Sequence, residues 1–466
     1  MGLKGKFFDK NLMSIGEGAT KLSVFSLALP IFFENVGVSL IGLIQTSLSS
    51  RFMDGFFVTP TGVANSTTSL LNTISSLVVT GMSILLSIYL GKKRDEDCKK
   101  IIGTAFIGYY LFRFLILGLG FALAVPLLKL QGMGTDGNIS RLGYSVTYFR
   151  WQCVMMTAFS VTGVLVAVMR CYGYTKAGLV SSISSSLVTL VLTYIGLYVR
   201  KTPENEVIPV LLIVSASAYT VSLALVTALF IKRKIKFKLH FEPTWLLKII
   251  KLGFPASISM VMYALSTLIT ASICVYLSEE MYMARLFVLH IVTFTNQLGY
   301  SVGQANSIMV GRGCGMGEFD FVNKMYYQNL RITLVSNFIF SSLASAAAPF
   351  LMRIFTDDSG IIGIGVALMW IDVAVEMGRG MNHLGQFGLN ATGDTVYTTI
   401  VSIVSCWVMS VGIGYLLGVT LGLGVYGLWI ASAADEIFRG VLYNVRWKNG
   451  RWKNRFLQEE KQLAIA

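Results

Sequence analysis

Long apolar runs alternate with short polar segments along the whole chain. A helix needs about twenty apolar residues to cross a bilayer, and windows of that length predict about twelve helices. The first six are expected at 22–50, 60–90, 101–128, 142–169, 177–199 and 208–231, and the second six at 252–277, 286–310, 329–353, 362–390, 396–418 and 422–445. The pattern therefore predicts an all-α polytopic membrane protein.

Lysine and arginine gather in every second gap between these helices. The N-terminal tail, 91–100, 170–176, 232–251, 311–331 and the C-terminal tail hold most of the 38 basic residues, whereas the opposite gaps hold isolated ones such as Arg285. Because basic loops resist translocation, the basic side is expected to face the cytoplasm. We predict a multi-pass protein of the cell (inner) membrane with both termini cytoplasmic. Topology also accounts for the net charge of +14, and no nucleic-acid-binding motif accompanies it.

The basic segment 232–251 (KRKIKFKLHFEPTWLLKIIK) lies in the middle of the chain. We expect it to join an N-lobe, 22–231, to a C-lobe, 252–445, with cytoplasmic tails at 1–21 and 446–466. Its lysines alternate with apolar residues and precede an amphipathic turn, which suits a segment lying on anionic lipid headgroups. A calmodulin-like or nucleic-acid-binding patch is the alternative.

The two halves repeat three landmarks in the same order and at nearly constant spacing. They are LALP ending at Pro30 and LGFP ending at Pro255, RCYGYT from Arg170 and NATGDT from Asn390, and the glycines Gly91 and Gly315. Three landmarks in register predict a duplicated six-helix unit. Since six is even, the repeats should be parallel, related by an axis along the membrane normal, with two pseudo-symmetric bundles around a central cleft that holds substrate.

Ionisable residues inside membrane spans are functional candidates because burying them in lipid is costly. The tenth predicted helix has the largest group, and its members share one helical face: Asp372, Glu376, Arg379, Asn382 and His383. This face must turn inward, either as an internal salt bridge or as a cavity wall whose carboxylates exchange H⁺ or Na⁺. Another acidic pair with an arginine falls at 435–439, near the end of the last predicted helix.

Glu34 lies alone in the apolar run of the first predicted helix. Its neighbours one turn later are Gly37 and Val38, so neutralisation requires a proton, a metal ion or a residue from another helix. We expect a site that is protonated at rest and loses its proton when it opens to water, as a coupling carboxylate must. The alternative is a glutamate near the headgroups whose side chain extends out to water.

Neutral and imidazole side chains within other predicted helices complete the candidate cavity: Asn72, Tyr263 and His290. Such groups more often form interhelical hydrogen bonds than ligand contacts. The chain has no phosphate-binding loop or metalloprotease motif, and its six cysteines show no ligand spacing. We therefore expect no catalytic activity, metal or cofactor, and transport driven by an ion gradient.

Six stretches, in this order, resemble the multidrug and toxic compound extrusion (MATE) transporters, within the wider superfamily that includes polysaccharide flippases. They are LALPIFFENVGVSLIGLIQT at 27–46, MRCYGYTKAG at 169–178, GFPASIS at 253–259, GQANSIMVGRGCGMGEFD at 303–320, NATGDT at 390–395 and GLGVYGLWIA at 422–431. The resemblance implies two six-helix bundles and antiport of organic cations or other amphipathic compounds against H⁺ or Na⁺.

The family's usual ion sites are altered in this chain. Gln45 stands where the first helix of the family carries an acid, Thr193 stands at the place of a second aspartate, and Tyr263 stands near a glutamate position of the seventh helix. We therefore assign coupling to Glu34, Asp372 and Glu376, and cavity contacts to the remaining candidates, including Gln45.

The leading hypothesis is a secondary active exporter of small amphipathic molecules that works by alternating access, and we expect it to be a monomer. A flippase for a lipid-linked saccharide or another lipid is the first alternative, and a degenerate transporter with altered coupling is the second. A receptor or scaffold has no sizeable soluble domain to support it.

Overall fold

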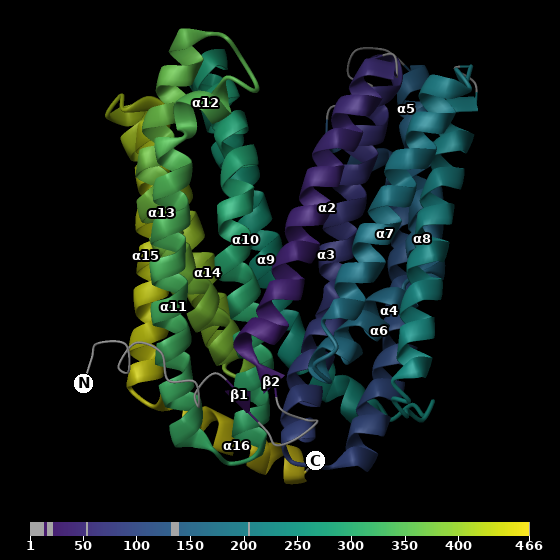
Figure 1. Cartoon of the computed structure of the whole chain (residues 1–466), viewed down its shortest axis with the longest axis vertical. Helices are drawn as coiled ribbons and strands as arrows, with labels where there is room; N and C mark the ends of the chain where they lie inside the picture. The colour runs from purple at the N-terminus through teal and green to yellow at the C-terminus, as the bar shows by residue number, and fades with distance from the viewer. Residues whose placement is uncertain (1–13, 16–21, 53–54, 132–138, 204–205, 466) are drawn as a thin grey trace. The chain divides into compact units, whose positions relative to one another are not determined.

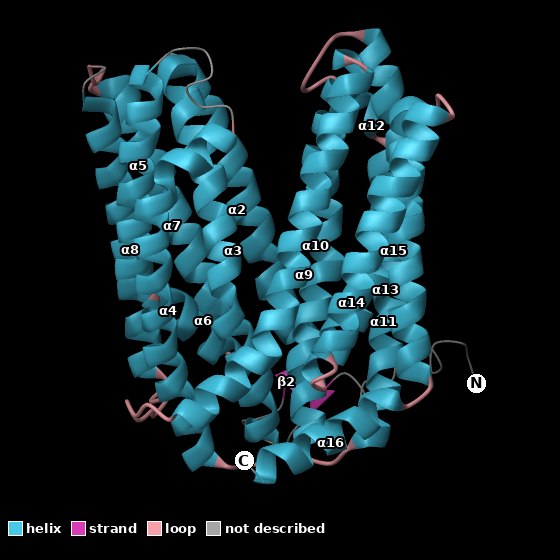
Figure 2. Ribbon diagram, turned by 180° about the vertical axis from the view of Figure 1, so that it is seen from behind, coloured by secondary structure: helices cyan, strands magenta, loops and turns pink. Residues whose placement is uncertain are grey.

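The computed structural model describes residues 14–15, 22–52, 55–131, 139–203 and 206–465 (Figure 1). Helices make up nearly all of this part of the chain, as Figure 2 shows, and the strands β1 (Ser14–Ile15) and β2 (Leu22–Ser23) form a single antiparallel pair. The all-α membrane class is confirmed. The helices divide into two compact units, which are described in turn.

The N-terminal unit comprises residues 33–86 and 95–250. Its elements are α2 (Val24–Phe52) from residue 33 onward, α3 (Gly55–Gly91) up to residue 86, α4 (Asp95–Leu130), α5 (Ile139–Ala158), α6 (Val161–Cys171), α7 (Lys176–Tyr194) with its π-helical extension η3 (Ile195–Val199), and α8 (Val207–Lys232). A cluster around Phe149 and Tyr148 joins α4, α5 and α8. Helices α7 and α8 pack side by side (Figures 1 and 2).

The C-terminal unit comprises the described part of residues 1–32, residues 87–94 and the chain from 251 onward. Its elements are α9 (Pro243–Leu277) from residue 251, α10 (Glu279–Gly315), α11 (Phe319–Ala346), α12 (Ala348–Met352), α13 (Ser359–Ala391), α14 (Thr395–Ser405), η5 (Cys406–Ile413), η6 (Leu416–Thr420), α15 (Gly424–Lys448) and α16 (Arg451–Ile465). Helix α13 packs most extensively on α15 and α10. The rings of Trp447 and Trp452 stack at 4.5 Å where α15 meets α16.

Hydropathy separates the helices into two groups. Within the described chain, eight helices are long and apolar enough to cross a membrane, or nine if α5 and α6, which meet at a bend of 44°, form one span. Helices α10, α11 and α15 are 37, 28 and 25 residues long, yet their polar content places them outside this group. Their buried residues include arginines, asparagines and carboxylates. These three helices therefore bury part of their polar residues inside the C-terminal unit.

Local sequence signals explain where several helices begin. The hydroxyl of Ser278 accepts a hydrogen bond from the Met281 N–H at 3.1 Å, and Glu279 and Glu280 in the first turn of α10 face its positive end. Asp358 caps α13 in the same way through the N–H of Gly360 at 2.7 Å. These caps supply partners for backbone donors that a helix leaves unpaired.

The repeated landmarks fold alike in the two halves. After α6, Gly173 has a φ of 92° and the Tyr174 N–H bonds the Met169 carbonyl at 2.8 Å; after α13, Gly393 has a φ of 84° and the Asp394 N–H bonds the Leu389 carbonyl at 3.0 Å. Left-handed conformations of this kind favour glycine at helix ends. The two turns therefore share the same backbone conformation and hydrogen-bond pattern.

Gly91 and Gly315 are required for another reason. A Cβ at Gly315 would lie 2.1 Å from the Ile88 carbonyl oxygen, and a Cβ at Gly91 would lie 2.2 Å from the Arg312 carbonyl oxygen. The ends of α3 and α10 therefore cross at backbone contact within the C-terminal unit, and only glycine permits this approach.

Part of the basic segment 232–251 is helical. Helix α9 begins at Pro243, so the predicted amphipathic turn at 245–250 is the first part of this continuous helix. The preceding residues pack on α4, where Lys100 Nζ lies 2.9 Å from Glu242 Oε1 and Thr104 bonds the His240 carbonyl. The hydrogen bond from Lys100 holds the pKa of Glu242 below its ordinary value. The lysines of residues 232–238 remain exposed.

Candidate functional site

The predicted polar face of α13 turns into the C-terminal unit. Asp372, Glu376 and Asn382 are buried, and the Arg379 side chain is 12% exposed. Within this face, Arg379 Nη1 lies 2.7 Å from Glu376 Oε1. The internal salt bridge anticipated from the sequence is therefore present, but it is part of a larger network.

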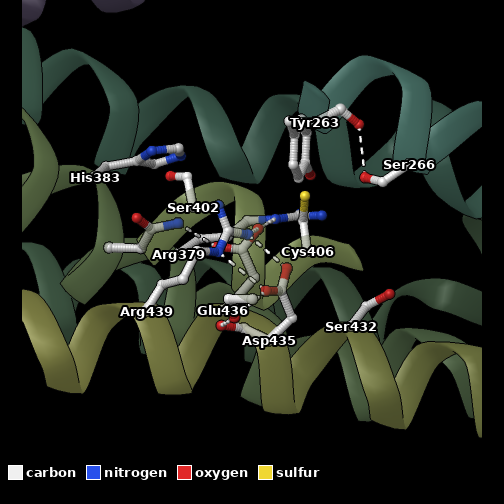
Figure 3. A network of polar contacts seen from close by, with 12 residues as sticks. Tyr263, Ser266, Arg379, His383, Ser402, Cys406, Ser432, Asp435, Glu436 and Arg439 are labelled. Atoms are coloured by element: carbon white, nitrogen blue, oxygen red, sulfur yellow. Dashed lines mark hydrogen bonds and ion pairs between the residues drawn. The ribbon is translucent and has the colours of Figure 1, made fainter. Parts of the chain in front are cut away.

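Helix α15 supplies the other half of this network, which Figure 3 shows from close by. Asp435, Glu436 and Arg439 lie in the middle of α15 rather than near its end, and all three are buried. Arg439 binds Asp435 at 2.7 Å and Glu436 at 2.9 Å. Helices α13 and α15 approach closely because a Cβ at Gly378 would lie 2.7 Å from the Ile437 backbone nitrogen.

Polar contacts connect α13 and α15 across their interface. Asn382 Nδ2 donates to Glu436 Oε2 at 2.6 Å, and Arg379 Nε lies 3.9 Å from Glu436 Oε1. At one end of the network, Trp429 Nε1 donates to Asp372 at 3.1 Å. We call Asp372, Glu376, Arg379, Asp435, Glu436 and Arg439 the acidic network.

The acidic network contains more carboxylates than guanidinium groups. Four acids share two arginines, so full ionisation of the acids would leave two uncompensated negative charges in a buried site. Glu376 Oε2 is buried and has no hydrogen-bond partner in the described part of the chain. Uncompensated buried charge is unfavourable, so this arrangement requires protons or a bound cation to balance it.

A small pocket borders the acidic network. It has a volume of about 60 Å³ and is lined from α9, α10, α13, η5 and α15 by Tyr263, Thr267, Thr270, Arg285, Leu289, Val375, Arg379, Ser410, Leu428, Trp429, Ser432, Asp435 and Glu436. A buried water needs roughly 10–15 Å³ of such space, so the pocket has room for several waters or for one small polar group. It gives the carboxylates a neighbouring polar space.

The other predicted residues of this unit lie at different distances from the network. Tyr263 lines the pocket, is 39% exposed, and its ring centroid lies 5.4 Å from the Arg439 guanidinium. His383 bonds Asn296 at 2.9 Å and meets the Tyr300 ring edge-on. His290 instead stacks on Phe355, with 6.0 Å between ring centroids, and does not line the pocket.

Glu34 lies in the N-terminal unit with partners from two other helices. Its Oε2 accepts a hydrogen bond from Arg170 Nη2 at 2.7 Å, and its Oε1 accepts one from Ser182 at 2.9 Å. The carboxylate packs on Gly178, where a Cβ would lie 2.6 Å from Oε2. Of the three neutralising groups that the sequence left open, the structure supplies a residue from another helix. Glu34 is 7% exposed and does not extend out to water.

The remaining candidates of the N-terminal unit are separate from Glu34. Asn72 Oδ1 accepts a hydrogen bond from Arg113 at 2.5 Å, and Tyr109 holds the same guanidinium at 2.8 Å. Gln45 is half-buried on α2. Each therefore stays a prediction for a cavity contact.

The sequence reasoning missed Arg170, Arg285 and the residues at 435–439 as members of a site. Arg170 and Arg285 were taken as loop residues, whereas α6 extends to Cys171 and α10 begins at Glu279. The spacing of Asp435 and Arg439, four residues apart, would have indicated an intrahelical ion pair.

Comparison with known proteins places this geometry in a family. The MatE family model matches residues 30–195 and 255–416, one match in each half of the chain, beginning at Pro30 and Pro255. The chain is 25% identical to an uncharacterised transporter, YisQ, of Bacillus subtilis over 439 residues, which cover 92% of this chain and 94% of that protein. It is 24% identical to a probable multidrug resistance protein, NorM, of Thermotoga maritima over 303 residues, covering 64% and 65% of the two chains.

Solved structures agree in fold. An aspartate-to-asparagine mutant of the MATE transporter VcmN of Vibrio cholerae superposes with a TM-score of 0.84 at 16% identity, covering 93% of this chain and 98% of that chain. A MATE structure in a bent conformation superposes with a TM-score of 0.83 at 15% identity, covering 95% and 96%. Together, the matches over both halves show that the chain belongs to the MatE family of multidrug and toxic compound extrusion transporters.

Proposed function

We propose that this chain is a secondary active transporter that exports amphipathic or cationic organic compounds in exchange for H⁺ or Na⁺ by alternating access. The observation that carries the proposal is the acidic network, in which four buried carboxylates share two arginines and no described residue forms a hydrogen bond with Glu376 Oε2. A site of this composition can bind and release a proton or a small cation, which is what coupling requires.

The coupling step follows from charge balance in the acidic network. A proton or Na⁺ bound near Glu376 or Asp372 would offset part of the surplus negative charge. A cationic substrate could offset the same surplus, so the two would compete for one buried negative site. Such competition couples their movements in opposite directions, because each favours release of the other. No resident cofactor is needed for this exchange.

Glu34 is a second coupling candidate. Its ion pair with Arg170 and its contact with Ser182 hold it between α2, α6 and α7. Protonation of Glu34 would remove the charge that binds Arg170 and free α6 to move relative to α2. This role is distinct from that of the acidic network, since Glu34 is already neutralised one to one.

Transport into inverted vesicles tests the proposal. The fluorescent cation ethidium should accumulate when the vesicle lumen is acidic or holds the higher Na⁺ concentration, because the exchanged ion must leave the vesicle as ethidium enters. Glu376→Gln or Glu34→Gln should abolish this gradient dependence in vesicles that contain equal amounts of protein. Asp394→Asn is the matched control, because Asp394 is a buried acid that binds Arg446 at 2.7 Å outside the acidic network. Ethidium accumulation by the wild-type protein that is independent of both gradients would refute coupled export.

The same proposal includes the setting of the protein. We infer that both termini lie in the cytoplasm, because basic residues gather on one side of the predicted helices. The monomeric state and the location in the cell membrane are part of the same proposal. The exposed lysines of residues 232–238 would then contact the anionic headgroups of the cytoplasmic leaflet.

A further inference from the structure

The strand pair β1–β2 is anchored on the end of α10. Ile15 of β1 and its register partner Leu22 of β2 are both buried. Strand β1 packs on α10, and Ile15 Cδ1 lies 3.2 Å from the position that a Cβ at Gly313 would occupy. Each strand has two residues. Because so short a pair is not stable by itself in water, its position depends on this apolar contact.

Glycine at position 313 provides the space for this contact. A Cβ there would lie 2.3 Å from Cγ2 of Val322 on α11, so a larger residue would displace both apolar side chains. Ile15 and Val322 therefore share one gap beside α10. Burial of the isoleucine removes apolar surface from water, and this effect holds the strand pair in place.

The opposite face of α10 contacts α3. A Cβ at Gly311 would lie 2.8 Å from Ser87 Cβ, and Gly315, one turn later, lies in backbone contact with Ile88. Gly313 is two residues from each of these glycines and points to the other side, since two residues turn an α-helix by about 200°. The end of α10 is therefore held between α3 on one face and β1 with α11 on the other.

The strand pair also leads directly into the first membrane helix. Strand β2 ends at Ser23, and α2 begins at Val24, which is buried. The described part of residues 1–32 belongs to the same compact unit as residues 87–94 and α10. The basic segments beside this end of α3 and α10 are the ones that we infer to be cytoplasmic.

We propose that the strand pair is a latch, in which Ile15 fills the space behind α10 and keeps the end of this helix against α3. The latch must leave Gly313 before α3 and α10 separate on the cytoplasmic side. Its role in transport rests on the alternating access of the proposed function, whereas the latch contact itself does not. Ile15 is held by side-chain burial and a two-residue strand, so the contact can open locally without unfolding the helices.

Thiol labelling of Cys314 in the purified full-length protein tests the latch. This native cysteine lies between Gly313 and Gly315 and is 2% exposed, so N-ethylmaleimide reaches it when the end of α10 is uncovered. In nanodiscs, Ile15→Ala should accelerate its labelling by about ten- to hundredfold, as expected when a buried isoleucine is truncated. Leu22→Ala should act in the same direction. Peptide mass spectrometry measures each thiol separately.

Cys274 is the matched reporter thiol for loss of the fold. It is fully buried on α9 in the same unit, in a hydrophobic cluster that includes Ile291. Unfolding would expose both thiols, whereas release of the latch should expose Cys314 and leave Cys274 covered. Ile291→Ala is the control variant, and it should lower the thermal midpoint without selective labelling of Cys314.

Equal Cys314 labelling in wild-type protein and Ile15→Ala would overturn the latch. If Ile15→Ala exposes both thiols, the milder Ile15→Val decides the result, and joint acceleration at Cys314 and Cys274 in that variant would also overturn it. In wild-type protein, Cys314 labelling should rise during ethidium transport, and a constant rate during measurable transport would overturn the role in transport. The labelling comparison needs no ion gradient, so a latch that opens as expected in a protein with gradient-independent transport would refute the coupling proposal alone.

Discussion

Replacing Arg439 should show how much the stability of the protein depends on the two arginines of the acidic network. Arg439 binds Asp435 through two hydrogen bonds, of 3.1 and 2.7 Å, and Glu436 at 2.9 Å. In Arg439→Gln, Asp435 keeps only the Ser405 hydroxyl at 2.5 Å as a strong partner. Breaking a buried ion pair on one side costs about 3–5 kcal/mol, so this variant should be markedly less stable.

A double-mutant cycle isolates the pair from the loss of packing. Asp435→Asn should cost less than Arg439→Gln, because Arg439 would still bind Glu436. The double variant Arg439→Gln with Asp435→Asn should be more stable than the sum of the two single effects predicts, by about 0.5–3 kcal/mol. Thermal unfolding of the purified protein in one detergent, followed by intrinsic fluorescence, measures the order of the midpoints.

The Arg446 and Asp394 pair is the matched comparison for this cycle. It has the same bidentate form, with bonds of 2.7 and 3.1 Å, but its guanidinium is 19% exposed. Solvent screening reduces such contributions, so Arg446→Gln should cost about 1 kcal/mol. Additive effects at Arg439 and Asp435, or equal losses at Arg439 and Arg446, would refute the idea that burial makes the network depend on its arginines.

Two further predictions concern packing and lipid contact. Gly315→Ala should lower the thermal midpoint strongly, because the new Cβ would lie 2.1 Å from the Ile88 carbonyl oxygen, whereas Gly118→Ala should be neutral or stabilising, since nothing lies within 4 Å of its Cβ position; equal midpoints would contradict this account of the α3 and α10 crossing. Replacing the exposed Lys234, Lys236 and Lys238 by glutamine should weaken the binding of anionic lipids by about 1 kcal/mol per lysine. Native mass spectra should then show fewer anionic lipids retained on the protein. Unchanged retention would remove the lipid role assigned to residues 232–238.

Helical periodicity alone was sufficient to predict which face of α13 is buried. Asp372, Glu376, Arg379 and Asn382 recur about every turn, and a membrane helix must turn such a face inward. The repeat was readable for a similar reason, because Gly173 and Gly393 occupy left-handed positions that other residues adopt at a cost. Both predictions depend on constraints within a single helix or turn.

Partners on other helices could not be predicted in this way. Glu34 showed no neighbour on its own helix, and its partners Arg170 and Ser182 are more than a hundred residues away in sequence. Arg285 was read as a loop cation because its charge lowers local hydropathy, although α10 begins six residues earlier. Tertiary packing decides which of several distant charges meet, and spacing along the chain does not encode that choice.

The two units differ in the ratio of buried carboxylates to arginines, and this difference indicates where ion exchange should occur. Among the described residues of the N-terminal unit, Arg170 is the cation that balances Glu34, so a proton there must displace an existing partner. In the C-terminal unit, four acids share two arginines, and one buried oxygen of Glu376 has no hydrogen-bond partner among the described residues, so a proton or Na⁺ can bind without breaking a contact. Ion binding should therefore be tighter at the acidic network than at Glu34. Glu376→Gln should accordingly remove ion dependence while Arg379 keeps its contact with Glu436 at 3.9 Å, whereas Glu34→Gln should remove the carboxylate that binds Arg170 and destabilise the contact between α2 and α6.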